Sequence, residues 1–403
     1  MHTSIYHTSV FRQLEKGARI LEPVTPKNNS LFSGKLGQVL YLSYAYKLTG
    51  DQAAVDKAMA LIDEVLSYLQ GPLDQVAREI AWTLPSLCFV LKVIREDGIL
   101  DIDLGEDELK VFDELIYTHT GVFLRDNNMD YLFGAPGSLH YLLTRLDENP
   151  AVAGYLEWLI GTLDTMGIED ERGIRFFNSH VNRQNKSKDL DTGLAHGQCG
   201  LLLVLLKVYE AGICRTVVRR IIEGMLHYLR GLKMQPDREA GYPSFYPVGM
   251  NEALDKTHPV NRAKYNNRMG WCYGDLNMTL VFYRAARILD LPVWMDEGDE
   301  VGLDCVTRLD VRDSDITAGH ICHGSASLVL LFNALYEERP LAAYLDASAY
   351  WTRFTEEYLE RQLQDPEAEP RSMEFLMGIP GSLLTLITGL LPGKTHWEQI
   401  LLL

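Results

Sequence analysis

The chain has 403 residues, 47% of them hydrophobic and 23% charged, a composition typical of a globular protein with a sizeable core. Its net charge of −17 at neutral pH argues against a nucleic-acid surface or a polybasic membrane patch. Because the amino terminus lacks the basic and apolar regions of a signal peptide, and no apolar run approaches the roughly 18–20 residues of a membrane span, we expect a cytoplasmic protein with no integral membrane segment and reduced cysteines.

A short glycine frame recurs along the chain. Pro136-Gly137-Ser138-Leu139 and Pro380-Gly381-Ser382-Leu383 repeat the same four residues, and an apolar run follows each of them. Gly-x-x-Gly frames, complete or partly kept, begin at residues 34, 83, 134, 197, 274, 324 and 378, and the copy at Thr83 keeps only small residues. The successive spacings are 49, 51, 63, 77, 50 and 54 residues. A period of about 50 is the length of two helices with two connections, so we interpret the chain as seven helical repeats.

The frames are typical of the starts of buried helices. Proline is favoured in the first helical turn, where its missing N–H costs nothing, and glycine permits close backbone approach. The runs after the frames, such as residues 201–209 and 328–335, are apolar nearly all round. Between them lie amphipathic segments with apolar residues at steps of three and four, as in Val218, Ile222, Met225 and Leu229. The pattern predicts an all-α fold of seven inner and seven outer helices, the first outer helix lying within about residues 8–20.

Such helices form either an open superhelix or a closed toroid, and periodicity does not choose between them. In a closed ring all inner helices run the same way, so the glycine-marked starts meet at one end of the barrel. Two spacings exceed 50 residues, by 13 (63 − 50) and by 27 (77 − 50), and the surplus falls in polar loops at about 167–193 and 233–269. The second loop contains the aromatic segment 241–247, which lines a peptide channel or forms an ordered surface loop. No linker is evident, so we expect residues 1–403 to form a single domain.

Two cysteines and one histidine share a register before their glycines. Cys272 and Cys322 lie two residues before Gly274 and Gly324, and His323 lies one residue before Gly324. Packing explains such a coincidence poorly, and a closed ring brings these positions together. Thiolate and imidazole donors select zinc, and three protein ligands leave a fourth position open, as in catalytic sites. We therefore predict one Zn²⁺ per chain on these three residues. The other cysteines, at positions 88, 199, 214 and 305, are expected to be buried thiols.

Four more residues belong to the same end of the predicted barrel. His196 shares the register of His323 and is a fourth ligand, a group behind the ligands, or a general acid or base. Tyr273 donates a proton from its hydroxyl or is a packed aromatic residue. Arg268 stabilises anionic charge or is a solvated loop residue. Asp130, four residues before a frame glycine, assists the chemistry or is an ordinary carboxylate at a helix start.

Taken together, these strings resemble the signature motifs of the lanthionine synthetase C-like family, the lantibiotic cyclases. Residues 193–197 read Gly-Leu-Ala-His-Gly, residues 271–275 read Trp-Cys-Tyr-Gly-Asp, and residues 322–324 read Cys-His-Gly. The Gly-x-x-Gly repeats are also that family's pattern, so the resemblance spans almost the whole chain. It implies an α/α toroid of seven inner and seven outer helices with zinc at one end, and Cys272, Cys322 and His323 as the ligands.

By motif position the resemblance also implies His196, Tyr273 and Arg268 as active-site residues, with Trp271 beside them. Asp130 is carried over on a looser motif, Asp-Tyr-Leu-Phe-Gly at 130–134. The chain departs from the family at positions 277 and 327, where it has asparagine and serine and the family often has glycine. Both positions lie a turn inside their helices, so we expect them to affect local packing rather than the site.

Members of this family add peptide cysteine thiols to dehydroalanine or dehydrobutyrine, which forms lanthionine or methyllanthionine rings. No dehydratase-like or kinase-like region precedes the motifs, so the chain resembles the stand-alone cyclase. The implied partners are a dehydrated precursor peptide as substrate, a separate dehydratase and an exporter.

The candidate residues suit this reaction. A free thiol is mostly protonated at neutral pH, whereas a zinc-bound thiol is deprotonated. Sulfur attack on the β-carbon builds an enolate, which needs charge stabilisation and then a proton at the α-carbon. His196 or Tyr273 delivers that proton, and Arg268 stabilises the negative charge. Asp130 orients His196 or accepts the displaced proton.

Three other functions use related parts. A protein prenyltransferase is also a thiol-activating zinc toroid, but its ligand set includes an aspartate. An (α/α) glycosidase needs a pair of carboxylates rather than thiolates. A non-cyclising relative in the same family binds glutathione, other thiols or peptides, and this zinc-binding protein is the main alternative.

Overall fold

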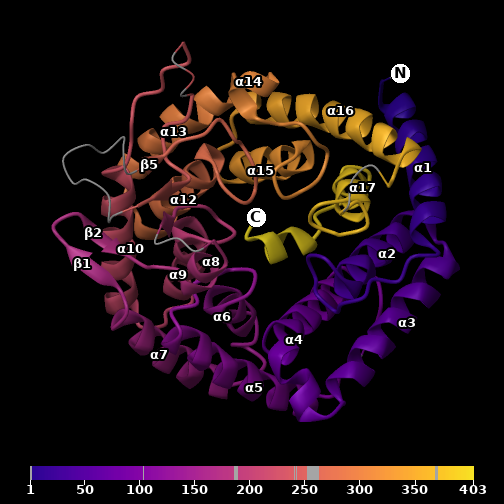
Figure 1. Cartoon of the computed structure of the whole chain (residues 1–403), viewed down its shortest axis with the longest axis horizontal. Coiled ribbons are helices and arrows are strands. Elements are labelled where there is room, and N and C mark those ends of the chain that lie inside the picture. The colour runs from indigo at the N-terminus through magenta and orange to yellow at the C-terminus, as the bar shows by residue number, and fades with distance from the viewer. Residues whose placement is uncertain are drawn as a thin grey trace.

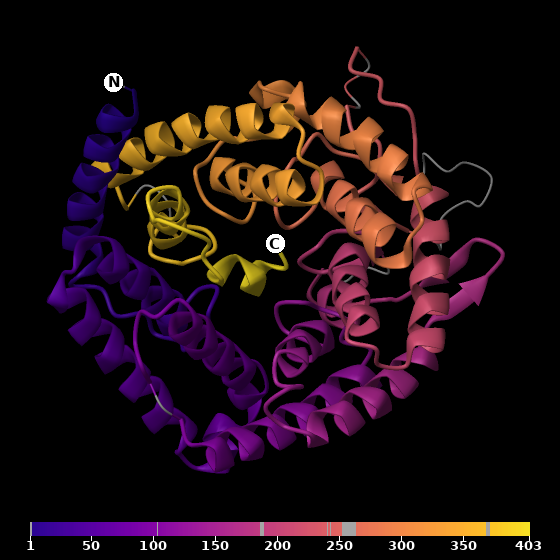
Figure 2. The same cartoon turned by 180° about the vertical axis from the view of Figure 1, so that it is seen from behind.

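The computed structural model describes residues 2–102, 104–185, 189–239, 241, 243–251, 263–367 and 371–403. Helices alternate between an outer and an inner position along the chain and close into a double ring (Figure 1). The view from behind shows the same two rings (Figure 2). The predicted α/α toroid is confirmed, and the open superhelix is excluded.

Within the described residues each ring holds seven helices. The outer helices are α1 (His2–Leu21), α3 (Gln52–Leu69), α5 (Glu106–Arg125), α7 (Ala151–Asp164), α10 (Arg215–Arg230), α13 (Val293–Val306) and α16 (Ala342–Gln364). The inner helices are α2 (Lys35–Thr49), α4 (Leu73–Glu96), α6 (Ala135–Leu143), α9 (Gln198–Glu210), α12 (Asp275–Leu289), α15 (Ser325–Glu338) and α17 (Ile379–Thr388). Between them lie α8 (Ser179–Asn185), α14 (Val311–Ser314), the 3₁₀ helix η1 (Trp397–Leu401), and the strands β1 (Ile168–Asp170), β2 (Gly173–Arg175), β3 (Leu190–Asp191), β4 (Gly249–Met250) and β5 (Ala263–Lys264). Across the described ranges, no helix combines the length and the apolar character needed to span a bilayer.

The first and last repeats close the ring. Helix α1 packs against α16 and α17, and α17 packs against α2. Gln13 on α1 donates from Nε2 to the backbone oxygen of Glu356 on α16 at 2.9 Å, and Lys16 pairs with Glu360 one turn further on. Polar contacts between residues far apart in the sequence therefore accompany the apolar packing at the closure.

Six of the seven predicted helix starts are N-caps in the structure. They are Gly34, Gly134, Gly197, Gly274, Gly324 and Gly378. The prediction at Thr83 is wrong, because α4 runs without a break from Leu73 to Glu96 with Pro85 in its interior. The residues before Thr83 are helical themselves, so the proline that predicts a start removes one hydrogen bond inside a longer helix instead. As a result, α4 has no loop at the barrel end where the other inner helices have one.

Backbone hydrogen bonds join the loops before these glycines into what we call the loop belt. The N–H of Tyr131 donates to the oxygen of Ala195, Ala195 to Cys272, Cys272 to Cys322, Cys322 to Leu376, and Leu376 to Phe32, at 2.9–3.2 Å. Each bond links one repeat to the next around the barrel. The loop belt places residues from six parts of the sequence at one end of the ring, and among the described residues it is interrupted at the position of α4.

The second glycine of each complete frame has a steric role. A β-carbon at Gly200 would lie 2.1 Å from the backbone oxygen of Leu194, because the loop presses against the first turn of the helix. In the repeats of Cys272 and Cys322, a side chain replaces this glycine and holds the loop. Asn277 donates from Nδ2 to the oxygens of Gly270 and Trp271 at 3.1 and 3.2 Å, and Ser327 donates to Gly324 at 2.6 Å. These departures from the family pattern change how the two loops are held.

We expect Gly200→Ala to lower the free energy of unfolding by about 1–3 kcal/mol, because the loop must move to admit the methyl group. Gly154→Ala is the matched control. Gly154 lies inside α7 with no atom within 4 Å of its β-carbon position, so alanine there should raise helix stability by about 0.5–1 kcal/mol. Urea denaturation followed by circular dichroism measures both changes. Equal stability of Gly200→Ala and wild type would contradict the steric role.

The two long insertions pair with one another. Strand β3 of the first insertion pairs antiparallel with β4 of the second, and β4 pairs with β5. Strands β1 and β2 form a separate hairpin inside the first insertion. Strands of two or three residues are too short to show a side-chain alternation, which is why the sequence predicts none of them.

The aromatic segment of the second insertion belongs to the core. Phe245 and Tyr246 are 5% and 2% exposed, and their N–H groups donate to the carboxylate of Asp275 at 2.9 and 3.0 Å. Asp275 also pairs with the buried Arg308 at 2.6 Å. Both expectations for this segment, a channel lining and a surface loop, are therefore wrong for residues 243–247, and Tyr242 lies outside the described residues. The segment instead braces the start of α12.

The end of the sequence lies in the middle of the ring (Figure 1). The oxygens of Ile400, Leu401 and Leu402 accept hydrogen bonds from Tyr131 Oη at 2.7 Å, Trp271 Nε1 at 2.8 Å and Arg284 Nη1 at 2.6 Å. We call residues 397–403 the tail. Two of its three partners lie in the loop belt or beside it, so the tail supports the belt from inside the barrel.

Candidate active site and metal centre

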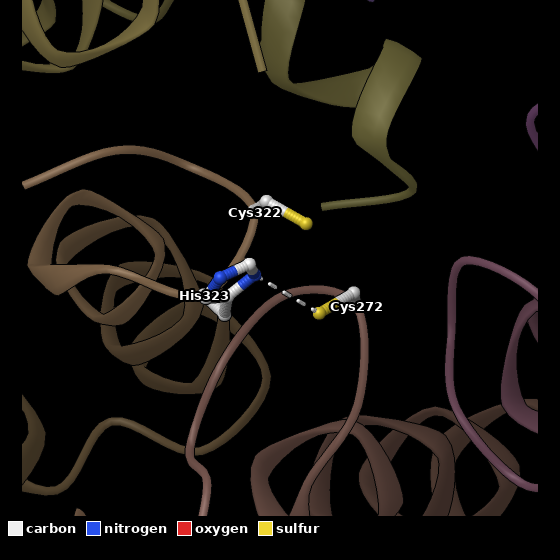
Figure 3. Close-up of side chains that lie close together, drawn as sticks. All are labelled: Cys272, Cys322 and His323. Carbon is white, nitrogen blue, oxygen red and sulfur yellow. Dashed lines mark hydrogen bonds between the residues drawn. The ribbon is translucent and has the colours of Figure 1, made fainter. Parts of the chain in front are cut away.

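The side chains of Cys272, Cys322 and His323 point toward one another from two neighbouring loops (Figure 3). Their donor atoms all lie within 4.8 Å of one another, and Cys272 Sγ lies 3.9 Å from His323 Nδ1. Two sulfur ligands of a tetrahedral zinc ion are separated by roughly 3.8 Å, so the three side chains have about the spacing of a zinc site. Among the described residues no fourth donor joins the group, and His196 in particular is not part of it. A metal held here therefore keeps a position open.

The charges of the two thiols also fit a cation. The hydrogen bond from the Cys272 thiol lowers the pKa of Cys322, whereas burial raises the pKa of Cys272. A divalent cation bound by both sulfurs would displace the proton that the two thiols share. Of the remaining cysteines, those at 88, 199 and 305 are buried as predicted, but Cys214 is only half-buried, at the start of α10.

His196 and Asp130 form a hydrogen-bonded pair at the same end of the ring. His196 Nδ1 lies 2.7 Å from Asp130 Oδ2, and Asp130 is fully buried. Its second oxygen accepts the N–H groups of residues 132–133 at 2.9 and 3.0 Å. Because Nδ1 is occupied by Asp130, Nε2 is the nitrogen of His196 that remains for chemistry.

The electrostatic surroundings of His196 favour its charged form. Burial lowers its pKa, but Asp130, followed by Asp191 and Cys322, raises it to about 9 overall. His196 in turn lowers the pKa of Cys322, so the pair lies within electrostatic reach of the predicted metal ligands. The structure thus brings the predicted His196 and Asp130 together beside the predicted ligands.

We expect the His196–Asp130 pair to stabilise the fold in a pH-dependent way. The folded pKa of about 9 lies above the usual value of 6.5, so the contribution is complete below about pH 6.5 and is lost as the pH rises through 9. In Asp130→Asn the main charge partner is gone, and the pKa of His196 should fall toward or below 6.5. An NMR titration of the imidazole protons in the metal-free protein measures both values. A wild-type His196 that titrates below 6.5 would contradict the ion pair.

Arg268 and Tyr273 form a second unit beside the predicted metal ligands. Arg268 donates from Nη1 to the Tyr273 hydroxyl at 3.1 Å and from Nε to Asp315 at 2.9 Å. Burial and the neighbouring Cys272 raise the pKa of Tyr273, so its hydroxyl keeps its proton. Arg268 is thus fixed on both sides rather than being a freely solvated loop residue.

Trp271 lies behind this site rather than in it. Its side chain is fully buried, and its indole N–H donates to the tail. Its ring stacks on Phe32 at a centroid distance of 6.5 Å and meets the edge of Tyr131 at 6.5 Å. Trp271 therefore anchors the loop that carries Cys272.

Two residues that the sequence did not predict form hydrogen bonds to the predicted site residues. Asn178, in the first insertion, donates from Nδ2 to Asp130 Oδ2 at 3.0 Å and to the backbone oxygen of His196 at 2.9 Å. Asp315 accepts from Arg268, as described above. A single asparagine or aspartate in a polar loop gives no signal by itself, and only the length of the first insertion pointed toward Asn178.

The chain is similar in sequence and in structure to known proteins. The sequence model of the family described as "Lanthionine synthetase C-like protein" matches residues 25–402. The nisin biosynthesis protein NisC of Lactococcus lactis subsp. lactis is 23% identical over 285 residues, which is 68% of this chain and 64%, slightly under two thirds, of that relative. The solved structure of nisin cyclase has a TM-score of 0.75 at 18% identity, over 98% of this chain and 97% of that one, and it supports the fold. Because the family match extends over nearly the whole sequence, the chain belongs to the lanthionine synthetase C-like family.

Proposed function

We propose that this protein is a zinc-dependent lanthipeptide cyclase. It adds the cysteine thiols of a dehydrated precursor peptide to dehydroalanine or dehydrobutyrine in the same peptide, which forms lanthionine or methyllanthionine rings. The observation that carries the proposal is the group of two thiols and one imidazole with a position left open, beside the His196–Asp130 pair. Membership of the family and the likeness to a nisin biosynthesis protein support it.

Cys272, Cys322 and His323 would hold the zinc ion, and the ion would keep a coordinated substrate thiol deprotonated at neutral pH. Two thiolates and a neutral imidazole cancel the charge of Zn²⁺, so the occupied site does not repel a substrate thiolate. The open fourth position is the place for that sulfur. A site closed by four protein ligands would have no such place.

The addition is balanced without a further reactant. The sulfur forms a bond to the β-carbon, the carbon–carbon double bond is lost, and the α-carbon takes up one proton in place of the one that the thiol released. The product therefore has the same mass as the substrate. The chain's own residues must supply the proton and stabilise the enolate that precedes it.

His196 is the proton donor in this proposal. Asp130 raises the pKa of His196, which favours its charged form, and holds the proton on Nδ1, so the proton that moves is the one on Nε2. Asn178 fixes both partners, because it bonds to the Asp130 carboxylate and to the backbone of His196. A positioned acid of this kind contributes roughly 10²–10⁴ to the rate.

Tyr273 and Arg268 would stabilise the enolate oxygen. Arg268 donates to the Tyr273 hydroxyl oxygen, which leaves the hydroxyl proton free to point at another acceptor. The positive charge behind the hydroxyl makes it a stronger donor. Loss of one such donor typically costs about 10²–10³ in kcat.

The expected partners follow from the chemistry of the substrate. Dehydroalanine and dehydrobutyrine arise by loss of water from serine and threonine, so we propose that a separate dehydratase acts before this protein. An exporter that takes the cyclised peptide would act after it. We place the reaction in the cytoplasm.

A synthetic peptide with one dehydroalanine and one cysteine tests the proposal. Incubation with the zinc-loaded protein should consume one free thiol per peptide with no change in mass. A peptide with alanine in place of dehydroalanine is the control and should keep its thiol. An unchanged thiol count with zinc bound would contradict the cyclase and favour a zinc protein that binds thiols or peptides without closing rings.

A further inference from the structure

The loop belt has an open end where α4 lacks a loop. In the five other loops, the residue two positions before the glycine offers its backbone oxygen to an N–H of the neighbouring loop; these residues are Phe32, Ala195, Cys272, Cys322 and Leu376. Leu132 holds the same position before Gly134, but within the described part of the chain its oxygen accepts no hydrogen bond. Pro136, four residues on, has no N–H to offer it from the helix. The belt thus ends on a free acceptor.

A recess opens at this same place. Its empty volume is about 410 Å³, part of it open to solvent, and it lies between α4, the loop before α2 and the start of α6. Phe32, Phe89 and Leu132 are buried in its wall, while Trp82 and Ser86 on α4 are partly exposed. The lining is therefore mainly apolar and aromatic, and Leu132, whose backbone oxygen is unpaired among the described residues, is one of the lining residues.

We propose that this recess binds an apolar side chain of the peptide substrate, and that the Leu132 oxygen accepts a backbone N–H of the peptide beside that side chain. The peptide then takes the place of the missing α4 loop in the belt. This is the form of recognition in which an extended segment adds to an exposed row of backbone groups, with a side-chain pocket next to it giving selectivity. The peptide nature of the ligand rests on the proposed function.

The position of the recess also sets which residue is recognised. Two hydrogen-bonded steps of the loop belt separate the loop of Leu132 from Cys272, with Ala195 between them. Hydrogen-bonded backbone segments lie about 4.8 Å apart, so the distance from this loop to Cys272 is roughly 10 Å. An extended peptide covers that distance in about three residues. The anchored side chain should therefore lie about three residues from the reacting cysteine, with His196 beside the path between them.

Two unreactive peptides test the recess. Each has one cysteine, no dehydroalanine and a glycine–serine background, and the residues three positions before and after the cysteine are both leucine or both alanine. Titration calorimetry with the zinc-loaded protein should show roughly tenfold tighter binding of the leucine peptide, as is typical for filling an apolar pocket. N-methylation of the leucines removes their N–H groups and should weaken binding by roughly fivefold.

Ser86→Leu fills the mouth of the recess and should bring the ratio of the two affinities to about one. Ser67→Leu, which adds the same side chain to the exposed face of α3, should keep the wild-type ratio. If Ser86→Leu unfolds or loses zinc, Trp82→Ala is used instead and should also abolish the preference. Equal affinities in the wild type, no measurable binding of the leucine peptide, or a preference that survives in the recess variants would overturn the proposal. Because these peptides cannot cyclise, the result stands apart from the test of ring formation.

Discussion

Replacement of His196 by alanine is expected to slow ring formation by roughly 10²–10⁴-fold while zinc stays near one ion per chain. The reason is that His196 lies outside the group of Cys272, Cys322 and His323 and is held by Asp130, so we propose that it moves protons rather than binding the metal. The rate of thiol loss from the dehydroalanine peptide gives the first quantity, and metal analysis of the purified variant gives the second.

His227→Ala is the matched control, since His227 is exposed on the outer helix α10 and should leave both quantities unchanged. The variant also separates two roles that the sequence leaves open. Loss of zinc from His196→Ala would make His196 a ligand and would contradict its assignment as the acid. A normal rate with normal zinc would remove it from the mechanism altogether.

Replacement of Cys322 by alanine is expected to abolish both zinc binding and ring formation. Loss of a ligand should exceed the roughly 10–100-fold drop in metal affinity that follows loss of a group behind the ligands. Cys322 is also the thiol whose pKa is lowered by the hydrogen bond from Cys272, so its removal takes away one of the two sulfur donors and that hydrogen bond. Metal analysis after dialysis against a weak chelator measures the effect.

Cys214→Ala serves as the control, because this half-buried thiol is not part of the group of Cys272, Cys322 and His323. It should retain zinc and activity. If Cys322→Ala kept a full complement of zinc, the three-ligand site would be refuted, even if activity were lost. Circular dichroism of both variants shows whether the toroid itself is intact.

The arrangement of the fold could be predicted because its signals are local and repeated. At Gly200 a β-carbon would lie 2.1 Å from a backbone oxygen, so glycine is required there and recurs at a fixed position of the repeat. The signal fails at Thr83, where Pro85 lies inside a continuous helix and no glycine is needed. The repeat signal also gives no information on the insertions, because β3 and β4 pair with each other but do not belong to the repeat of about 50 residues.

The candidate site divides in the same way. Cysteine and histidine are common metal ligands, and these three share a position relative to the repeat glycines, so Cys272, Cys322 and His323 could be predicted to meet. Asn178 could not, because a polar loop residue becomes informative only when its partners are known. The tail is the clearest case, since the contact of Trp271 with Leu401 joins residues 130 positions apart and uses a backbone oxygen that any residue provides.

The most direct test of the central claim is X-ray absorption at the zinc edge, with and without a cysteine peptide. The site described here predicts two sulfur ligands, one nitrogen ligand and one light atom in the free protein, and three sulfurs with one nitrogen once the peptide is bound. A site with two sulfurs and two protein nitrogens that does not change when peptide is added would contradict an open metal position, and with it the proposed activation of the substrate thiol.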